Sequence, residues 1–119
     1  MQSNELVKVV ETELDLRKGL HIISLDVQNK SSITDYMVIV SASSSRHARS
    51  LCDYVQIKAK ELGVQPLGLE GQTGSDWMLL DLGDVILHVM TGQAREYYQL
   101  EKLWSVPASS ESQSRTGVS

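Results

Sequence analysis

The run Tyr36-Met37-Val38-Ile39-Val40 constrains the fold of this chain more than any other segment. Its side chains are apolar on both sides of an extended backbone, as in a central strand that is covered on both faces. A serine-rich turn, Ser41 to Ser45, follows, and its hydroxyls can cap a helix. Apolar residues then recur every three or four positions from Ala48 until Gly63, which predicts that helix and its end. Strand, turn and helix form the first two-thirds of a βαβ unit.

The remaining periodic segments predict further strands and helices. Alternation after Gly19 predicts a strand with one wetter face, and Gly83-Asp84 lies between two alternating segments as the tight turn of an antiparallel hairpin. The predicted elements are a helix over residues 4–16, strands over 21–27, 67–69, 77–82 and 85–90, and a last helix over 93–104. The fold class is therefore α/β, with a mixed sheet of about five strands packed with helices.

The length of 119 residues suits a single domain. We expect this domain to span residues 1–105. The remaining residues, 106–119, are rich in serine and have no apolar period, so we expect a disordered tail there.

Composition narrows the classes of protein. The net charge of −4 argues against a free-standing DNA or RNA binder, which needs a basic face for phosphates. Cys52 is the only cysteine, so neither an internal disulfide nor a cysteine-based metal cluster can form. The N-terminus does not resemble a signal peptide, and no apolar stretch is long enough to span a bilayer. These features predict a cytoplasmic protein that does not act on a membrane.

Candidate catalytic groups each have a simpler structural explanation. The turn Ser41 to Ser45 could cradle a phosphate, but it has neither glycine nor a P-loop lysine, which favours an ordinary helix cap. Asp81 and Asp84 are three positions apart, so they do not share a strand face, and a solvated hairpin turn explains them. His88 lies mid-strand as a packed, hydrogen-bonded imidazole, and Cys52 lies in the apolar helix stripe. We predict no enzyme activity, catalytic residue, metal or cofactor.

An acidic and aromatic region stands out between Pro66 and Glu101. Six acidic residues lie in it against one basic residue, Arg95, and extension to Trp104 adds the second tryptophan to two tyrosines. Aromatic anchors beside charges are typical of a surface that binds a basic protein. The acidic residues are Glu70, Asp76, Asp81, Asp84, Glu96 and Glu101.

Trp77 begins the strand in which the two faces differ most. Trp77, Leu79 and Asp81 share one face, whereas Met78, Leu80 and Leu82 share the other, purely apolar face. The apolar face should point to the core. The face that ends in a carboxylate is either an exposed binding patch or is covered by the last helix through Tyr97 or Trp104, and the sequence leaves both readings open.

Several spaced motifs resemble the ribosomal silencing factor (Iojap-like) family over about residues 5–105. The longest are residues 76–90, DWMLLDLGDVILHVM, and residues 95–104, REYYQLEKLW. The other matching segments are Leu25-Asp26-Val27, Ser31-Ser32-Ile33-Thr34-Asp35-Tyr36, Ser43-Ser44-Ser45-Arg46-His47 and Glu70-Gly71. The resemblance implies a fold related to nucleotidyltransferases but without their catalytic residues. It implies binding to large-subunit ribosomal protein L-fourteen, steric obstruction of subunit joining and lower translation when nutrients are scarce.

The resemblance and the strand faces together predict the docking residues. The strand contribution is Trp77, Leu79 and Asp81; the helix contribution is Tyr98, Glu101 and Trp104; Glu70 and Asp76 are rim charges. Some members of the family form homodimers, so a homodimeric interaction module is one alternative. A residual nucleotide-binding domain that uses Ser43 to Ser45 is another. Magnesium–ATP titration and sedimentation at several concentrations would separate these from ribosome docking.

Overall fold

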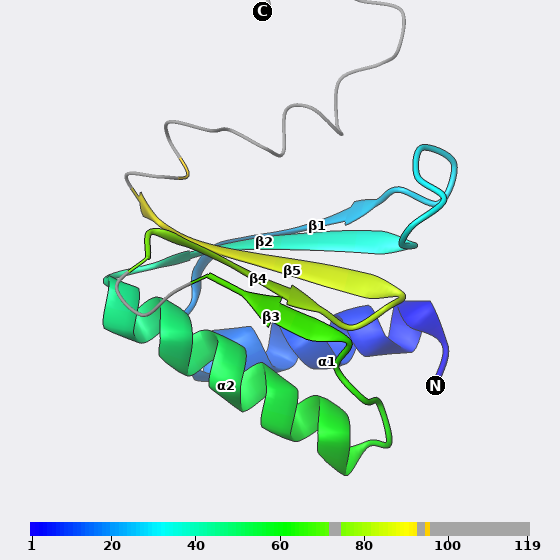
Figure 1. The fold of residues 1–119 in the computed structure, drawn as a ribbon, viewed down its shortest axis with the longest axis horizontal. Coiled ribbons are helices and arrows are strands. Elements are labelled where there is room, and N and C mark those ends of the chain that lie inside the picture. The colour runs from blue at the N-terminus through cyan, green and yellow to red at the C-terminus, as the bar shows by residue number, and fades with distance from the viewer. Residues whose placement is uncertain (72–74, 93–94, 96–119) are drawn as a thin grey trace, which may run out of the picture.

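The computed structural model describes residues 1–71, 75–92 and 95. These residues form two layers, with helices α1 and α2 packed on one face of a single sheet (Figure 1). The element order is α1 (Ser3–Leu16), β1 (Leu20–Asp26), β2 (Tyr36–Ala42), α2 (Ser45–Glu61), β3 (Gly68–Glu70), β4 (Trp77–Asp81) and β5 (Val85–Thr91). The predicted mixed sheet of five strands is confirmed.

The strands lie in the order β1-β2-β5-β4-β3. β2 pairs in parallel with β5, whereas β1–β2, β5–β4 and β4–β3 are antiparallel. Because two antiparallel pairings separate β5 from β3, β3 runs parallel to β2. The predicted βαβ unit is therefore β2-α2-β3, and the hairpin strands β4 and β5 lie between its two strands.

Apolar side chains are buried on both faces of the sheet. Between the sheet and the helices, Val38, Val40, Leu80 and Leu87 are each 0% exposed. On the opposite face, which we call the second face, Met37 and Ile39 of β2 pack with Val27. The expectation of a central strand covered on both sides is confirmed for β2, because its residues are buried on both faces.

Both helices begin with a cap, and the sequence predicts the one that precedes α2. The backbone N–H of Gln2 donates to Glu5 Oε1 at 3.0 Å at the start of α1. Ser44 is the N-cap of α2, and its Oγ accepts the backbone N–H of His47 at 3.1 Å. The serine turn is thus an ordinary helix cap, as expected.

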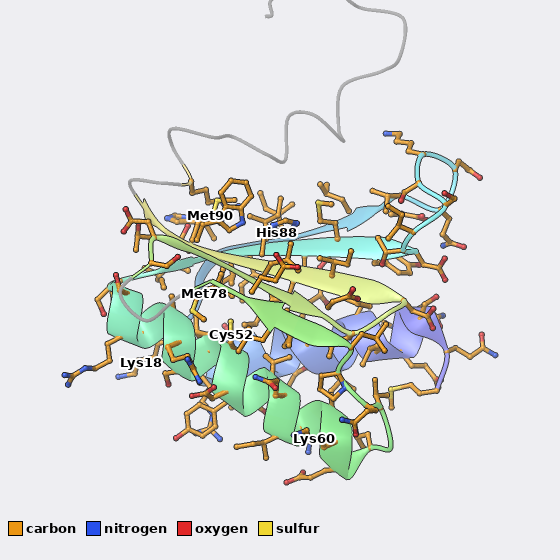
Figure 2. The ribbon with its side chains drawn as sticks, viewed as in Figure 1. Lys18, Cys52, Lys60, Met78, His88 and Met90 are labelled. Carbon is orange, nitrogen blue, oxygen red and sulfur yellow. The ribbon has the colours of Figure 1, made fainter. Side chains whose placement is uncertain are left out.

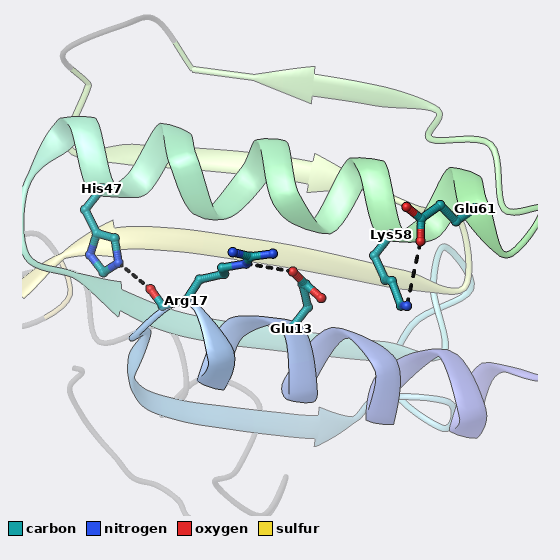
Figure 3. Close-up of polar contacts among 5 residues, drawn as sticks. All are labelled: Glu13, Arg17, His47, Lys58 and Glu61. Carbon is teal, nitrogen blue, oxygen red and sulfur yellow. Dashed lines mark hydrogen bonds and ion pairs between the residues drawn. The ribbon is translucent and has the colours of Figure 1, made fainter.

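The C-terminal end of α1 is fixed to the start of α2 (Figure 3). The Arg17 side chain pairs with Glu13 at 2.9 Å and lies 3.7 Å from the centre of the Tyr54 ring of α2. His47 Nε2 lies 2.9 Å from the Arg17 carbonyl oxygen, and His47 Nδ1 accepts the N–H of Ser43 at 3.0 Å. Together these contacts fix the two helices side by side against the sheet.

Four local expectations need correction or stay untested. The polar side of β1 was expected to be its wetter face, but Ser24 lies on the helix side and donates to Glu11 of α1 at 2.5 Å. A helix that covers an edge strand can accept a hydrogen bond from a serine hydroxyl of that strand. The polar residues of β1 therefore do not identify its solvent-facing side. The short strand begins at Gly68 and not at Leu67. The last helix, 93–104, and the tail, 106–119, lie outside the described residues, apart from Arg95.

Candidate functional site

The two faces of β4 differ as the alternation predicts. Met78 and Leu80 are 1% and 0% exposed and point into the core beneath the helices. Trp77, Leu79 and Asp81 are half-buried on the second face. Figure 2 shows the same division in its labelled residues, with Met78 on the helix side of the sheet and His88 on the second face. The strand part of the predicted docking surface therefore shares one face.

Glu70 and Asp76 flank this group. Glu70 is the register partner of Leu79, and since paired residues share a face, its exposed side chain lies beside the β4 residues. Asp76 is exposed just before β4 begins. Asp81 has a structural task as well, because its Oδ1 accepts the N–H of Gly83 at 2.8 Å in the hairpin turn. We call Glu70, Asp76, Trp77, Leu79 and Asp81 the docking face.

Trp77 is tied to β5 through its indole nitrogen. Its Nε1–H donates to His88 Nδ1 at 2.9 Å, and the two ring centres lie 5.7 Å apart at 49°. His88 is 6% exposed, and burial lowers its pKa from 6.5 to about 4. The imidazole is therefore neutral at pH 7 and has a lone pair on Nδ1 for the indole proton. The expected packed, hydrogen-bonded histidine is confirmed.

The backbone around Trp77 is fixed on three sides. Ser75 Oγ accepts the Trp77 N–H at 3.1 Å and donates to its carbonyl oxygen at 2.7 Å. Thr91 donates its N–H to the Asp76 carbonyl at 2.9 Å. Gly71 has a φ of +112°, and a Cβ there would lie 2.9 Å from the Trp77 carbonyl oxygen. Glycine is needed at that point because the end of β3 passes so close to β4.

Arg95 is buried, although the sequence presents it only as the one basic residue of the acidic region. It is 7% exposed and donates to the carbonyl oxygens of Leu20 and His21 and, at 3.1 Å, to Ser41 Oγ. Its guanidinium thus binds the ends of β1 and β2.

Asp81, Asp84 and Cys52 occupy the structural positions that the sequence predicts for them, in the hairpin turn and in the core. Asp81 and Asp84 lie at the hairpin, and Cys52 is 0% exposed, with burial raising the pKa of its thiol to about 12. Among the described residues, no three His, Cys, Asp or Glu side chains gather to hold a metal. In the same part of the chain, no helix has the length and apolar character to cross a membrane. Three predicted docking residues, Tyr98, Glu101 and Trp104, lie outside the described residues.

The sequence reasoning missed the pairing of His88 with Trp77. The signal was present, because a tight turn at Gly83-Asp84 fixes the hairpin register and places Trp77 opposite Met90. His88, two residues from Met90, is then a diagonal neighbour on the same face. Arg95 gave no comparable signal, since its partners lie more than fifty residues away in the chain.

A five-stranded mixed sheet with two helices on one face, and with Trp77 among carboxylates on the other, defines a small α/β domain. The family described as "Ribosomal silencing factor during starvation" matches residues 1–118. The chain belongs to this ribosomal silencing factor family. Membership implies association with the ribosome and regulation of translation, a regulatory role and not a catalytic one.

Individual relatives agree with this assignment. A ribosomal silencing factor of Haemophilus influenzae is 44% identical over 100 residues, which cover 84% of this chain and 98% of that protein. A crystal structure of a Chromobacterium violaceum protein has a TM-score of 0.85 at 36% identity and covers 96% of this chain and 95% of that chain. A mouse protein named for mitochondrial assembly of the ribosomal large subunit is 34% identical over 88 residues, 71% of this chain and 39% of its own length.

Proposed function

We propose that this protein binds large-subunit ribosomal protein L-fourteen and thereby blocks the joining of the ribosomal subunits. Translation then falls when nutrients are scarce. The observation that carries the proposal is the combination of family membership with an aromatic, acidic docking face on a rigid strand. The action is steric and needs no bond made or broken, so we infer a protein without enzymatic activity that works in the cytoplasm.

The chemistry of the docking face supports a basic protein partner. Trp77 and Leu79 offer apolar area on a strand whose backbone is held by paired neighbours. Glu70, Asp76 and Asp81 supply negative charge around them. At such an interface the aromatic anchor contributes most of the binding free energy, while the surrounding carboxylates mainly raise the association rate. The mouse relative, named for the ribosomal large subunit, makes that subunit the side on which we expect docking.

The proposal is tested by truncating the anchor. Trp77→Ala should weaken capture of purified large subunits by more than about tenfold, the effect of losing a central aromatic anchor. Tyr54→Ala is the matched control, because Tyr54 is an aromatic residue with an exposed side, at 38%, and lies on α2 at the opposite side of the sheet from the half-buried Trp77. Cosedimentation measures both, and circular dichroism checks that each variant is folded. Equal capture by wild type and Trp77→Ala would remove Trp77 from the interface.

The proposed block of subunit joining is tested separately. The protein should comigrate with isolated large subunits and lower the yield of joined ribosomes when it is added before the small subunit. It should have little effect on ribosomes that are already joined, because a steric block needs the free subunit face. If the protein captured large subunits without any change in subunit joining, it would be a ribosome-binding protein, but the proposed block of joining would be refuted.

Self-association is compatible with the same face. If two copies pair through Trp77, a homodimer would compete with the ribosome for one surface. Sedimentation equilibrium at several concentrations, with and without Trp77→Ala, distinguishes the cases. A dimer that Trp77→Ala dissociates would place self-association on the docking face, whereas a dimer that survives the substitution would use another surface.

A further inference from the structure

We propose that His88 is a positioning residue for ribosome docking: by accepting the indole N–H of Trp77, it fixes the orientation in which that tryptophan meets its partner. The inference rests on the proposed function, since it concerns the same docking face. It adds a residue that does not itself need to touch the ribosome. His88 acts through Trp77 from the neighbouring strand.

The geometry of the hairpin makes His88 suited to this task. Leu79 and His88 are direct register partners, and Trp77 lies opposite Met90, so the indole reaches diagonally across β4 and β5. The hydrogen bond from Trp77 Nε1 to His88 Nδ1 is 2.9 Å long, which is ordinary N–H···N geometry. The rings pack at 49°, so contact and hydrogen bond restrain the same side chain.

The surroundings of His88 keep the acceptor in place. The imidazole is 6% exposed, and its register neighbour on β2, Ile39, is fully buried. Burial holds the ring neutral, and the Trp77 donor assigns the proton of the neutral ring to Nε2. A rigid acceptor inside the sheet can thus restrain a tryptophan that is half-buried at the surface.

This pairing also determines what Trp77 offers to a partner. An indole has one N–H donor and a large apolar surface, and here the donor is directed back into the protein. The part of the ring that a partner covers is then apolar. Restraining the ring before binding reduces the side-chain entropy that is lost on docking, which is how preorganisation strengthens an interface.

The experiment is a double-mutant cycle with a rescue variant. His88→Leu has nearly the same size but no acceptor. His88→Asn keeps an oxygen acceptor at the position of Nδ1, and Trp77→Phe keeps an aromatic ring without the donor. His88→Leu should weaken large-subunit capture about fivefold, the size expected for one hydrogen bond. His88→Asn should recover most of the loss. In the Trp77→Phe background His88→Leu should change capture by less than about twofold.

A second readout does not depend on the ribosome. The indole N–H signal of Trp77 in proton–nitrogen NMR, identified by its loss in Trp77→Phe, should exchange slowly with solvent in wild type. It should exchange faster in His88→Leu and slowly again in His88→Asn. This signal reports the hydrogen bond even if Trp77 proves to be outside the interface, so the two hypotheses fail separately.

Two results would overturn the inference. The first is an equal loss of capture from His88→Leu in the wild-type and Trp77→Phe backgrounds, because that loss would come from general damage to the sheet. The second is unchanged capture by His88→Leu although the indole exchanges faster, because the orientation of Trp77 would then not matter for docking.

Discussion

The protonation of His88 should make the stability of the whole domain depend on pH in a defined window. Burial lowers the pKa of His88 from 6.5 to about 4 in the folded protein. Between these two values the unfolded chain binds a proton that the folded protein does not, so acid favours unfolding. The contribution of His88 to the free energy of unfolding is therefore unchanged above about pH 7, and it is lost as the pH falls through 6.5 towards 4.

The magnitude follows from the two pKa values. Linkage gives a loss of about 2 kcal/mol from this one group by about pH 5, and about 3 kcal/mol by about pH 4. For a small domain this is a large share of a total free energy of unfolding of about 5–15 kcal/mol. His88 is 6% exposed, so solvent does little to screen the effect.

Urea unfolding followed by circular dichroism measures the effect at several pH values. The comparison is between wild type and His88→Gln, which removes the ionisable group but leaves the other histidines and the carboxylates in place. Wild type should lose about 3 kcal/mol more than His88→Gln between about pH 7.5 and about pH 4. A constant difference between the two proteins across that range would refute a buried, neutral imidazole beneath Trp77.

Three further predictions follow from the packing. Leu80→Ala should lower the free energy of unfolding by about 2–5 kcal/mol, and Leu79→Ala by clearly less, because only Leu80 is fully buried; equal losses in urea unfolding would contradict the face assignment. Ser44→Ala should cost about 1 kcal/mol through loss of the α2 cap, measured in the same way, with no loss meaning that the cap is dispensable. Cys52 should react with a thiol reagent only as fast as the domain opens, since burial raises its pKa to about 12; rapid labelling in native buffer would contradict this.

Local patterns were enough to predict most of the secondary structure and the faces of β4. The alternation from Trp77 onward depends only on the period of a strand, and the structure places its residues accordingly. The serine cap of α2 and the turn at Gly83 are likewise local, because each is satisfied within three residues. In these places the chemistry of neighbouring residues determines the structure.

Contacts between distant segments were harder to predict. β5 lies beside β2 in the sheet. No local pattern in the sequence predicts this pairing. Ser24 lies on the same side of β1 as Ile22, towards α1, and donates to Glu11 there, which is the reverse of the expected polarity of β1. Arg95 binds carbonyl groups of β1, and its role could not be read from its acidic neighbours. The docking face itself stays a prediction, derived from family likeness and strand geometry.

The hairpin register links stability to docking in this protein. Because successive side chains alternate, a shift of one residue would move Met78 and Leu80 out of the core and Trp77 into it. The register is fixed at the turn, where Gly83 has a φ of +86° and donates its N–H to Asp81 Oδ1 at 2.8 Å. Asp81 therefore holds the turn, in addition to the docking role that we propose for its carboxylate. A core that requires this register also fixes Trp77 and His88 in their places, so the surface that we expect to meet the ribosome is determined by the same pairing that folds the sheet.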